Sequence, residues 1–391
     1  MRNAVQTTTF YTLKYNINTM LLTLKAKLYP TIEQKKMLVD TMEQFNNACN
    51  SISKIAFGLR CQNKYKLQQK CYYDIRKEFN LPAQLAIRAI SKVVESYKVD
   101  KTCIHMFDKY GAIVYDQRVL SFKGLDKASI TTTEGRVIVP MIYGSYVKLD
   151  ESRIKGQADL IYIKGDMYLC IVVDVPEEIP LTPEGVLGVD MGVVNIATTS
   201  DGVIYSSDKC NGVRERFSKL KSTLQSVGTK SAKRHLKNIS GKERRFKTNT
   251  NHIIAKQIVQ VAKDTNRAIA VEELTHIRSR TTVKKAQREQ FGKWAFSQLR
   301  LFLEYKSKLI GVPFVSVDPR NTSRECSVCG YIDKNNRTSQ AEFKCRECGH
   351  TEHADYNAAK NIAARALVNM PIAVCSKEKL NRKPTTLVVG Y

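Results

Sequence analysis

Residues 324–367 read RECSVCGYIDKNNRTSQAEFKCRECGHTEHADYNAAKNIAARAL, and this stretch decides how the rest of the chain is interpreted. It contains two Cys-x-x-Cys-Gly motifs, with fifteen residues between the last cysteine of the first motif and the first cysteine of the second. This spacing is typical of a zinc ribbon whose four thiolates leave the metal no open coordination position. We therefore expect one structural Zn²⁺ ion that stabilises a segment with little core of its own. Its predicted ligands are Cys326, Cys329, Cys345 and Cys348.

The same stretch ends in an Ala-rich helical pattern that opens with Asp355. Toward the N-terminus, two apolar segments with strand character, Val186–Asp190 and Arg267–Glu272, each end in a carboxylate. Two short strands follow the first segment, a helical crossover leads to the second, and a helix over about 288–310 precedes a strand at 312–317. An acid on the first strand, another on the fourth strand and a third at the start of a late helix match the plan of an RNase H-like α/β fold.

Asp190, Glu272 and Asp355 suit the chemistry of phosphodiester hydrolysis. Two Mg²⁺ ions about 3.5–4 Å apart assist that reaction, and Mg²⁺ prefers hard oxygen ligands. Each acid also has an ordinary structural interpretation, as a turn residue between glycines, a solvated strand end and a helix N-cap, respectively. Their order along the chain favours a shared metal site. Because adjacent strand residues point to opposite faces, only one of Glu272 and Glu273 can enter that site.

The charge of the chain limits its partners. The 391 residues include 63 Lys and Arg against 37 Asp and Glu, a net charge of +26. A field of this sign and size attracts polyanions. The sequence has no apolar run of about 18 residues and no apolar N-terminal core typical of a signal peptide. We therefore expect no membrane partner and a cytoplasmic protein that binds nucleic acid.

Residues 214–247 form a basic helical segment with twelve Lys or Arg and two Glu. Such a segment suits contact with a phosphate backbone, whereas a solvated helix face is the ordinary alternative. The predicted nucleic-acid-binding residues are Lys219, Lys221, Lys230, Lys233, Arg234, Lys237, Arg244, Arg245, Lys247 and, beside the first cysteine motif, Arg324.

The N-terminal half has a different character. Residues 21–29 alternate like a strand, Thr31–Gln34 has the spacing of a capping box, and helical patterns continue to about residue 98. From residue 103 to residue 175 the chain is rich in Val, Ile, Tyr and Thr, with hairpin turns at Thr133–Arg136 and Lys164–Asp166. We expect an antiparallel β-barrel with a helical domain inserted after its first strand.

The chain resembles the TnpB family of transposon-associated, RNA-guided nucleases, which are related to compact type V CRISPR effectors. Two positions depart from the family's pattern, since Glu273 stands where Asp is common and Arg324 where Gln is frequent. The resemblance rests on Gly188–Gly192, Val271–Leu274, Pro319–Gly330, Cys345–Gly349 and Asp355–Ile362.

This resemblance implies a RuvC-like site in which Asp190, Glu272 and Asp355 hold two catalytic Mg²⁺ ions. It also implies a guide RNA and a double-stranded DNA target that is recognised beside a short target-adjacent motif. The guide–target hybrid would be held through its backbone, while base pairing reads the sequence. Two alternatives stay open: an RNA-guided DNA-binding protein or transposon regulator that does not cleave, and an unguided RNase H-like nuclease.

The predicted organisation is a multidomain α/β protein. Its parts are an N-terminal extension (1–20), a wedge-like β-barrel (21–30 and 101–180), a helical recognition domain (31–100), a RuvC-like nuclease domain (185–321 and 353–368), a zinc-binding insertion that contacts the target (322–352) and a C-terminal tail (369–391).

Overall fold

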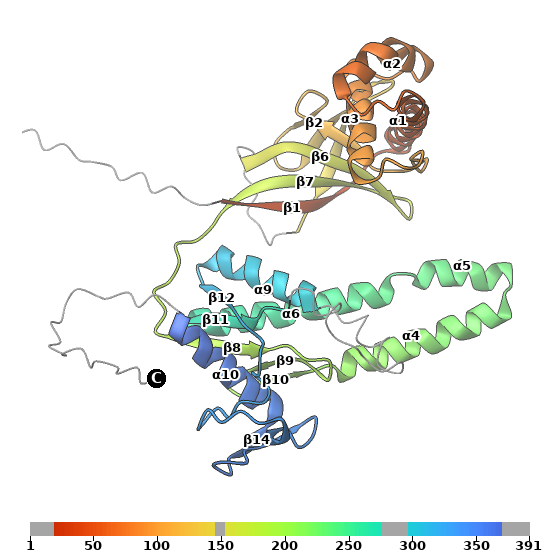
Figure 1. The fold of residues 1–391 in the computed structure, drawn as a ribbon. Helices are drawn as coiled ribbons and strands as arrows, with labels where there is room; N and C mark the ends of the chain where they lie inside the picture. The colour runs from red at the N-terminus through yellow and green to blue at the C-terminus, as the bar shows by residue number, and fades with distance from the viewer. Residues whose placement is uncertain (1–18, 145–152, 275–295, 370–391) are drawn as a thin grey trace, which may run out of the picture. The chain divides into compact units, whose positions relative to one another are not determined.

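The structure is a computed structural model that describes residues 19–144, 153–274 and 296–369 (Figure 1). The chain forms two compact units, Met1–Pro176 and Glu177–Tyr391. Most of the predicted extension, the predicted tail after residue 369 and the first part of the helix predicted at about 288–310 lie outside the described residues. Among the described residues, no helix combines the length and the apolar character needed to cross a membrane.

The first unit contains a nearly closed seven-stranded antiparallel sheet, in the order β2-β6-β7-β1-β5-β4-β3. The two edge strands follow one another in sequence, and Thr131 ties them together. Its amide donates to the carbonyl of Val119 (2.9 Å), and its carbonyl accepts from the hydroxyl of Tyr115 (3.1 Å). Both predicted hairpin turns are confirmed, and in place of a closed barrel the structure has a nearly closed antiparallel sheet. The strands are β1 (Thr19–Leu28), β2 (Ile113–Asp116), β3 (Leu120–Phe122), β4 (Lys127–Thr132), β5 (Gly135–Ile142), β6 (Ile154–Ile163) and β7 (Asp166–Pro176).

Three helices follow β1: α1 (Ile32–Gly58), α2 (Lys64–Glu78) and α3 (Ala83–Val99). The predicted capping box begins α1, because the Thr31 hydroxyl accepts from the Gln34 amide and the Gln34 side chain accepts from the Thr31 amide. The apolar faces of the helices and the inner face of the barrel contribute to one hydrophobic core. In this unit the helices and the barrel are thus joined by shared side-chain packing.

The second unit is built on a five-stranded mixed sheet, in the order β10-β9-β8-β11-β12. Strands β8 (Gly185–Asp190), β9 (Asn195–Thr199) and β10 (Ile204–Ser206) form an antiparallel meander. Strands β11 (Arg267–Glu272) and β12 (Phe314–Val317) run parallel to β8. Alternation along β8 sends Leu187 and Val189 to one core and Val186 to another, so both faces of the sheet are covered.

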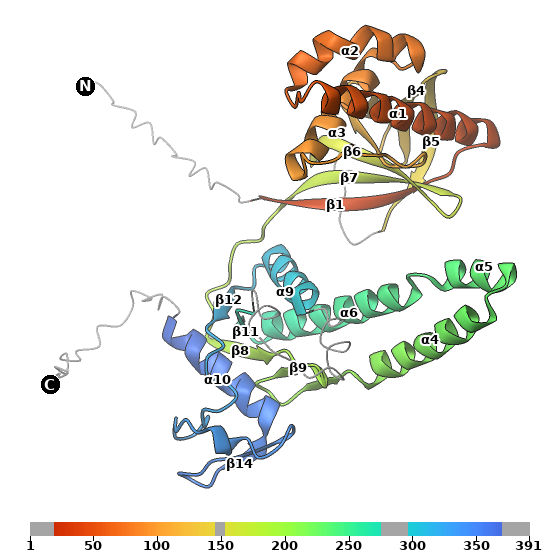
Figure 2. The same ribbon diagram turned by 45° about the vertical axis from the view of Figure 1, so that its right-hand side comes forward.

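Helices α6 (Lys242–Asp264) and α9 (Phe296–Ile310) cover one face, and α10 (Ala354–Asn369) crosses the other (Figure 1). The basic segment forms α4 (Asp208–Val227), α5 (Lys230–Ile239) and the first part of α6. These helices fold back on each other and extend beyond the sheet (Figure 2). Between β12 and α10 lie η2 (Lys334–Asn336) and a small hairpin of β13 (Glu342–Lys344) and β14 (Thr351–His353).

Candidate active site

Two of the three predicted acids lie side by side at the ends of neighbouring parallel strands. Val189 of β8 pairs with Val271 of β11, and Asp190 and Glu272 are the next residues of these strands. Because strand side chains alternate, both acids share the sheet face of Gly188 and Ala270, which is the face that α10 covers. The local sequences explain this position, since each strand is an apolar run that ends at its acid.

Helix α10 brings the third acid to the same place. Its first turn carries Asp355, which is only 6% exposed. The helix backbone lies directly against β8 at Gly188, where an added Cβ would lie 2.0 Å from the carbonyl oxygen of Ala359 and 2.7 Å from the amide nitrogen of Ala363. A glycine is therefore required at this position for the helix, and with it Asp355, to reach the end of the strand.

Glu273 takes no part in this cluster. Its carboxylate pairs with the guanidinium of Arg300 on α9. Since α9 covers the opposite face of the sheet from α10, the two consecutive glutamates are directed to different sides. Of the two, Glu272 lies with the other acids.

The electrostatics agree with this grouping. Burial raises the pKa of Asp190 well above its usual value, and the carboxylates of Glu272 and Asp355 raise it further, against the opposing charge of Arg337. Burial also raises the pKa of Glu272, against a hydrogen bond from Thr322. Carboxylates at such close quarters are stable as anions only beside cations. The cluster is thus a set of hard oxygen donors suited to divalent metal ions.

Three polar residues that sequence reasoning missed complete the surroundings of the acids. Arg337, which follows η2, places Nη2 3.3 Å from Oδ1 of Asp355. Asn195, at the start of β9, donates from Nδ2 to Oδ2 of Asp355 (2.9 Å). The hydroxyl of Thr322 donates to Oε1 of Glu272. Arg337 and Asn195 belong to no motif named above, and Thr322, although it lies within Pro319–Gly330, carries no signal of its own. Only the folded chain reveals their proximity to the acids.

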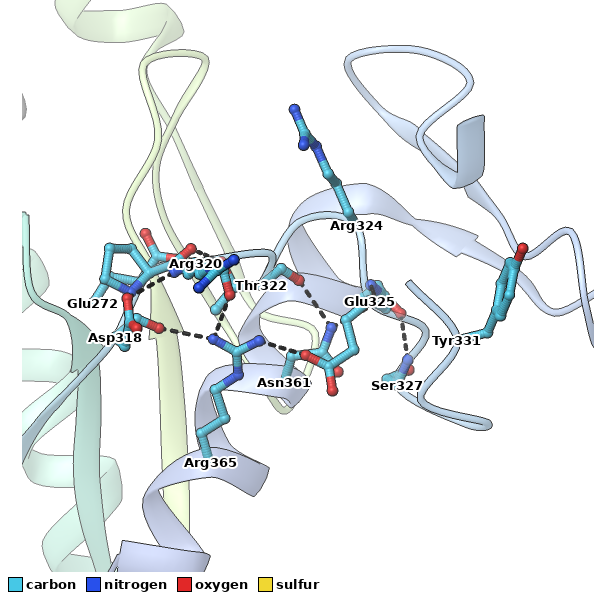
Figure 3. Close-up of polar contacts among 12 residues, drawn as sticks. Glu272, Asp318, Arg320, Thr322, Arg324, Glu325, Ser327, Tyr331, Asn361 and Arg365 are labelled. Carbon is cyan, nitrogen blue, oxygen red and sulfur yellow. Dashed lines mark hydrogen bonds and ion pairs between the residues drawn. The ribbon is translucent and has the colours of Figure 1, made fainter. Parts of the chain in front are cut away.

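One face of α10 holds the loop of residues 318–325, which leads from β12 toward the cysteine cluster (Figure 3). Asn361 Nδ2 donates to the carbonyls of Thr322 (2.9 Å) and Glu325 (2.7 Å). Arg365 Nη1 donates to two further carbonyls of this loop at 2.8 and 2.6 Å, and its Nη2 pairs with the carboxylate of Glu325. The helix that carries Asp355 thereby also positions the threonine that contacts Glu272.

The four predicted cysteines converge. Their Sγ atoms all lie within 4.8 Å of one another, with 3.7 Å between Cys326 and Cys348 and 3.5 Å between Cys329 and Cys345. Tetrahedral zinc with Zn–S bonds of about 2.3 Å would separate its sulfurs by about 3.8 Å, so the cluster fits such an ion. The glycine after each motif has a positive φ of 74° or 72°, as this turn requires. The cluster could therefore hold a metal ion such as zinc.

The predicted nucleic-acid contacts divide into two groups. Lys221 of α4 pairs with Glu243 of α6 at 3.1 Å and so helps to join the two helices, whereas Lys247 pairs with the same carboxylate at 3.5 Å within α6. Arg324 is exposed, and its side chain points away from Glu272 (Figure 3). The remaining predicted cations are exposed along α4, α5 and α6: Lys219, Lys230, Lys233, Arg234, Lys237, Arg244 and Arg245.

Comparisons with known proteins match this architecture. A family model described as "Cas12f1-like, TNB domain" matches residues 296–362. The TnpB-like protein MJ0751 of Methanocaldococcus jannaschii is 30% identical over 196 residues, which are 47% of this chain and 69% of that protein. The chain belongs to the TnpB family.

Other relatives of this TnpB family member are named CRISPR-associated endodeoxyribonuclease Cas12f1. The one from Syntrophomonas palmitatica is 29% identical over 265 residues, which are 55% of this chain. The chain spans about a quarter to a half of the length of the first Cas12f1 relatives, 27% and 52%. A cryo-EM structure of a Cas12f1–sgRNA–target DNA complex shares the fold, with a TM-score of 0.57 and 15% identity over 88% of this chain and 99% of that one.

Proposed function

We propose that this chain is an RNA-guided DNA endonuclease with a RuvC-like active site. The observation that carries the proposal is the convergence of Asp190, Glu272 and Asp355 from β8, β11 and α10. A meander followed by two parallel strands, with helices on both faces, is the arrangement expected of an RNase H-like domain. Family membership supports the same reaction, because relatives are named endodeoxyribonucleases.

Asp190, Glu272 and Asp355 would hold two Mg²⁺ ions. When bound, such ions supply a nucleophilic water and stabilise the leaving oxygen of the phosphodiester. The chain itself sets the positions of the ligands: parallel pairing of β8 and β11 aligns the first two, and close packing at Gly188 aligns the third. Burial and repulsion between the carboxylates destabilise the charged form of Asp190. A bound cation relieves this cost, so the cluster favours cation binding.

Arg337 gives the cluster a cation of its own. Its guanidinium pairs with Asp355 and opposes the rise in the pKa of Asp190. In this proposal the same fork of donors also binds a non-bridging oxygen of the scissile phosphate. We assign Arg337 this positioning role at the reaction centre.

RNA guidance is the second part of the proposal. It is supported by the net charge of +26, by the exposed cations of α4, α5 and α6, and by the fold shared with a Cas12f1–sgRNA–target DNA complex. In this assignment the barrel acts as the wedge domain, α1 to α3 as the recognition domain, and residues 322–352 as a zinc-bound insertion near the target. Recognition of a target-adjacent motif belongs to the same proposal.

The test is to purify the chain from cells that carry its gene with the flanking DNA, and to sequence the RNA that accompanies it. A discrete RNA that ends in a variable segment is then used to direct cleavage of a matching plasmid in Mg²⁺, with Asp190→Ala as control. Loss of cleavage with retained RNA binding in the control is expected. Heterogeneous RNA with cleavage of structured substrates would favour an unguided nuclease, whereas guided binding without cleavage would favour a DNA-binding regulator.

A further inference from the structure

The first unit contains a cationic pocket far in sequence from the carboxylate cluster. It is an open depression with a volume of about 410 Å³. Its walls come from the start of α2, from α3, from the turn between β2 and β3, and from a bulge in β6. Helix α3 packs against β2 (Figure 1). Its lining includes Lys64, Gln84, Arg88, Asp116, Arg118 and Gln157.

Three cations line this pocket, against one carboxylate. Lys64, Arg88 and Arg118 carry the positive charges, and Asp116 carries the negative charge. The Asp116 carboxylate already accepts from Gln84 Nε2 and from the amide of Arg118, and it lies 3.8 Å from Arg88 Nε. Asp159, outside the lining, also interacts electrostatically with Arg88, and the three cations still exceed these two acids by one positive charge.

Arg88 indicates the chemistry of a ligand that would suit this pocket. Its side chain is only 12% exposed, and its Nε and Nη2 atoms are buried with no hydrogen-bond partner. A buried positive charge without a hydrogen-bond partner costs free energy, so a negatively charged group in the adjoining pocket is favoured. A phosphate group, which accepts paired N–H bonds from a guanidinium, is the chemistry that fits.

Asp116 distinguishes between kinds of phosphate ligand. A carboxylate beside a phosphate repels it, unless the ligand also brings a donor for the carboxylate. A carboxylate has about four lone-pair positions, and the hydrogen bonds from Gln84 and Arg118 use two of them. The 2′-hydroxyl of a ribose is such a donor, and deoxyribose lacks it. The side-chain amide of Gln157 adds a second partner for a sugar hydroxyl.

We propose that this pocket binds one backbone phosphate of RNA together with its neighbouring ribose, with Arg88 and Arg118 on the phosphate and Asp116 on the 2′-hydroxyl. The inference rests on the proposed function only in taking RNA as the partner. It assigns a specific RNA-binding site to the N-terminal unit, in addition to the basic helices that the sequence indicated.

The experiment measures binding of a labelled oligouridylate and of its deoxy counterpart of equal length, as a function of salt and without added Mg²⁺, to the full chain. Arg88→Gln and Arg118→Gln should each weaken RNA binding about three- to tenfold and reduce the salt slope by about 0.7, the loss of one single-strand phosphate contact. Lys98→Gln is the matched control: it removes an exposed cation about 15 Å along the same helix and should change neither value. Asp116→Asn should reduce the ratio of the affinity for the oligouridylate to the affinity for its deoxy counterpart.

Arg118 is exposed, so its variant keeps the test informative if Arg88→Gln does not fold. An unchanged salt slope in folded Arg118→Gln, equal losses in Lys98→Gln, or equal losses on RNA and DNA would each overturn the proposal. Because this readout needs no cleavage, failure of the pocket is distinguishable from failure of the nuclease assignment.

Discussion

Replacing Gly188 with alanine is the most direct test of how the carboxylate cluster is assembled. The new Cβ would lie 2.0 Å from the carbonyl oxygen of Ala359, so α10 must retreat by about 1.4 Å to reach the 3.4 Å at which ordinary contact begins. Overpacking of this kind costs about 1–3 kcal/mol, which lowers the Tm of a unit of this size by about 2–12 °C. Because Asp355 lies on the first turn of α10, it moves with the helix.

A displacement of about 1 Å in a catalytic arrangement can reduce the rate about 100-fold, so Gly188→Ala should lose at least that much cleavage while it stays folded at low temperature. Gly185→Ala is the matched control on the same strand, because its Cβ would meet the Arg267 side chain at an ordinary 3.6 Å. Mg²⁺-dependent plasmid cleavage and thermal unfolding of both variants provide the comparison. Cleavage by Gly188→Ala within twofold of the unmodified chain would refute the packing argument.

Three further predictions concern the two metal sites. Because the pKa of Asp190 is raised in the folded state, the fold without Mg²⁺ loses stability as pH rises from 3.8 through the folded-state pKa. Asp190→Asn should therefore unfold at a higher temperature than the unmodified chain at neutral pH. In acid the two proteins should unfold at the same temperature. Mg²⁺ at 100 times its Kd should add about 2.7 kcal/mol, or about 5–11 °C, to the unmodified chain alone, and equal Mg²⁺ shifts in both proteins would contradict the site. Thr322→Val removes a hydrogen bond that lowers the pKa of Glu272, so the acidic limb of the pH–rate profile should move to higher pH; an unshifted limb would count against this contact. Cys345→Ser should lose bound zinc by elemental analysis and destabilise the C-terminal region, whereas retained zinc would disprove the four-cysteine site.

The sequence carried enough information for the parts of the fold that depend on local pattern. The cysteine spacing, the apolar strands that end at Asp190 and Glu272, and the capping box at Thr31 are each encoded within a few residues. The hairpins of the barrel are equally local, because turn residues and alternation determine them. These features could therefore be predicted before any contact between distant segments was known.

The missed features depend on contacts between distant segments. Arg337 lies in an irregular loop with no periodic signal, and its pairing with Asp355 exists only because the cysteine ribbon folds back onto α10. The basic segment shows the same limit. Sequence alone treated its cations alike, whereas folding pairs Lys221 of α4 with Glu243 of α6. Their contacts with nucleic acid remain predictions.

Helix α10 ties the two proposed metal sites to one rigid element. It carries Asp355 at its first turn, and through Asn361 and Arg365 it holds the loop that enters the cysteine cluster. Two binding events that order the same helix are thermodynamically linked, and such linkage is reciprocal. Zinc should therefore raise the affinity for magnesium by the same factor by which magnesium raises the affinity for zinc. A cell short of zinc would then also need more magnesium to keep this protein active.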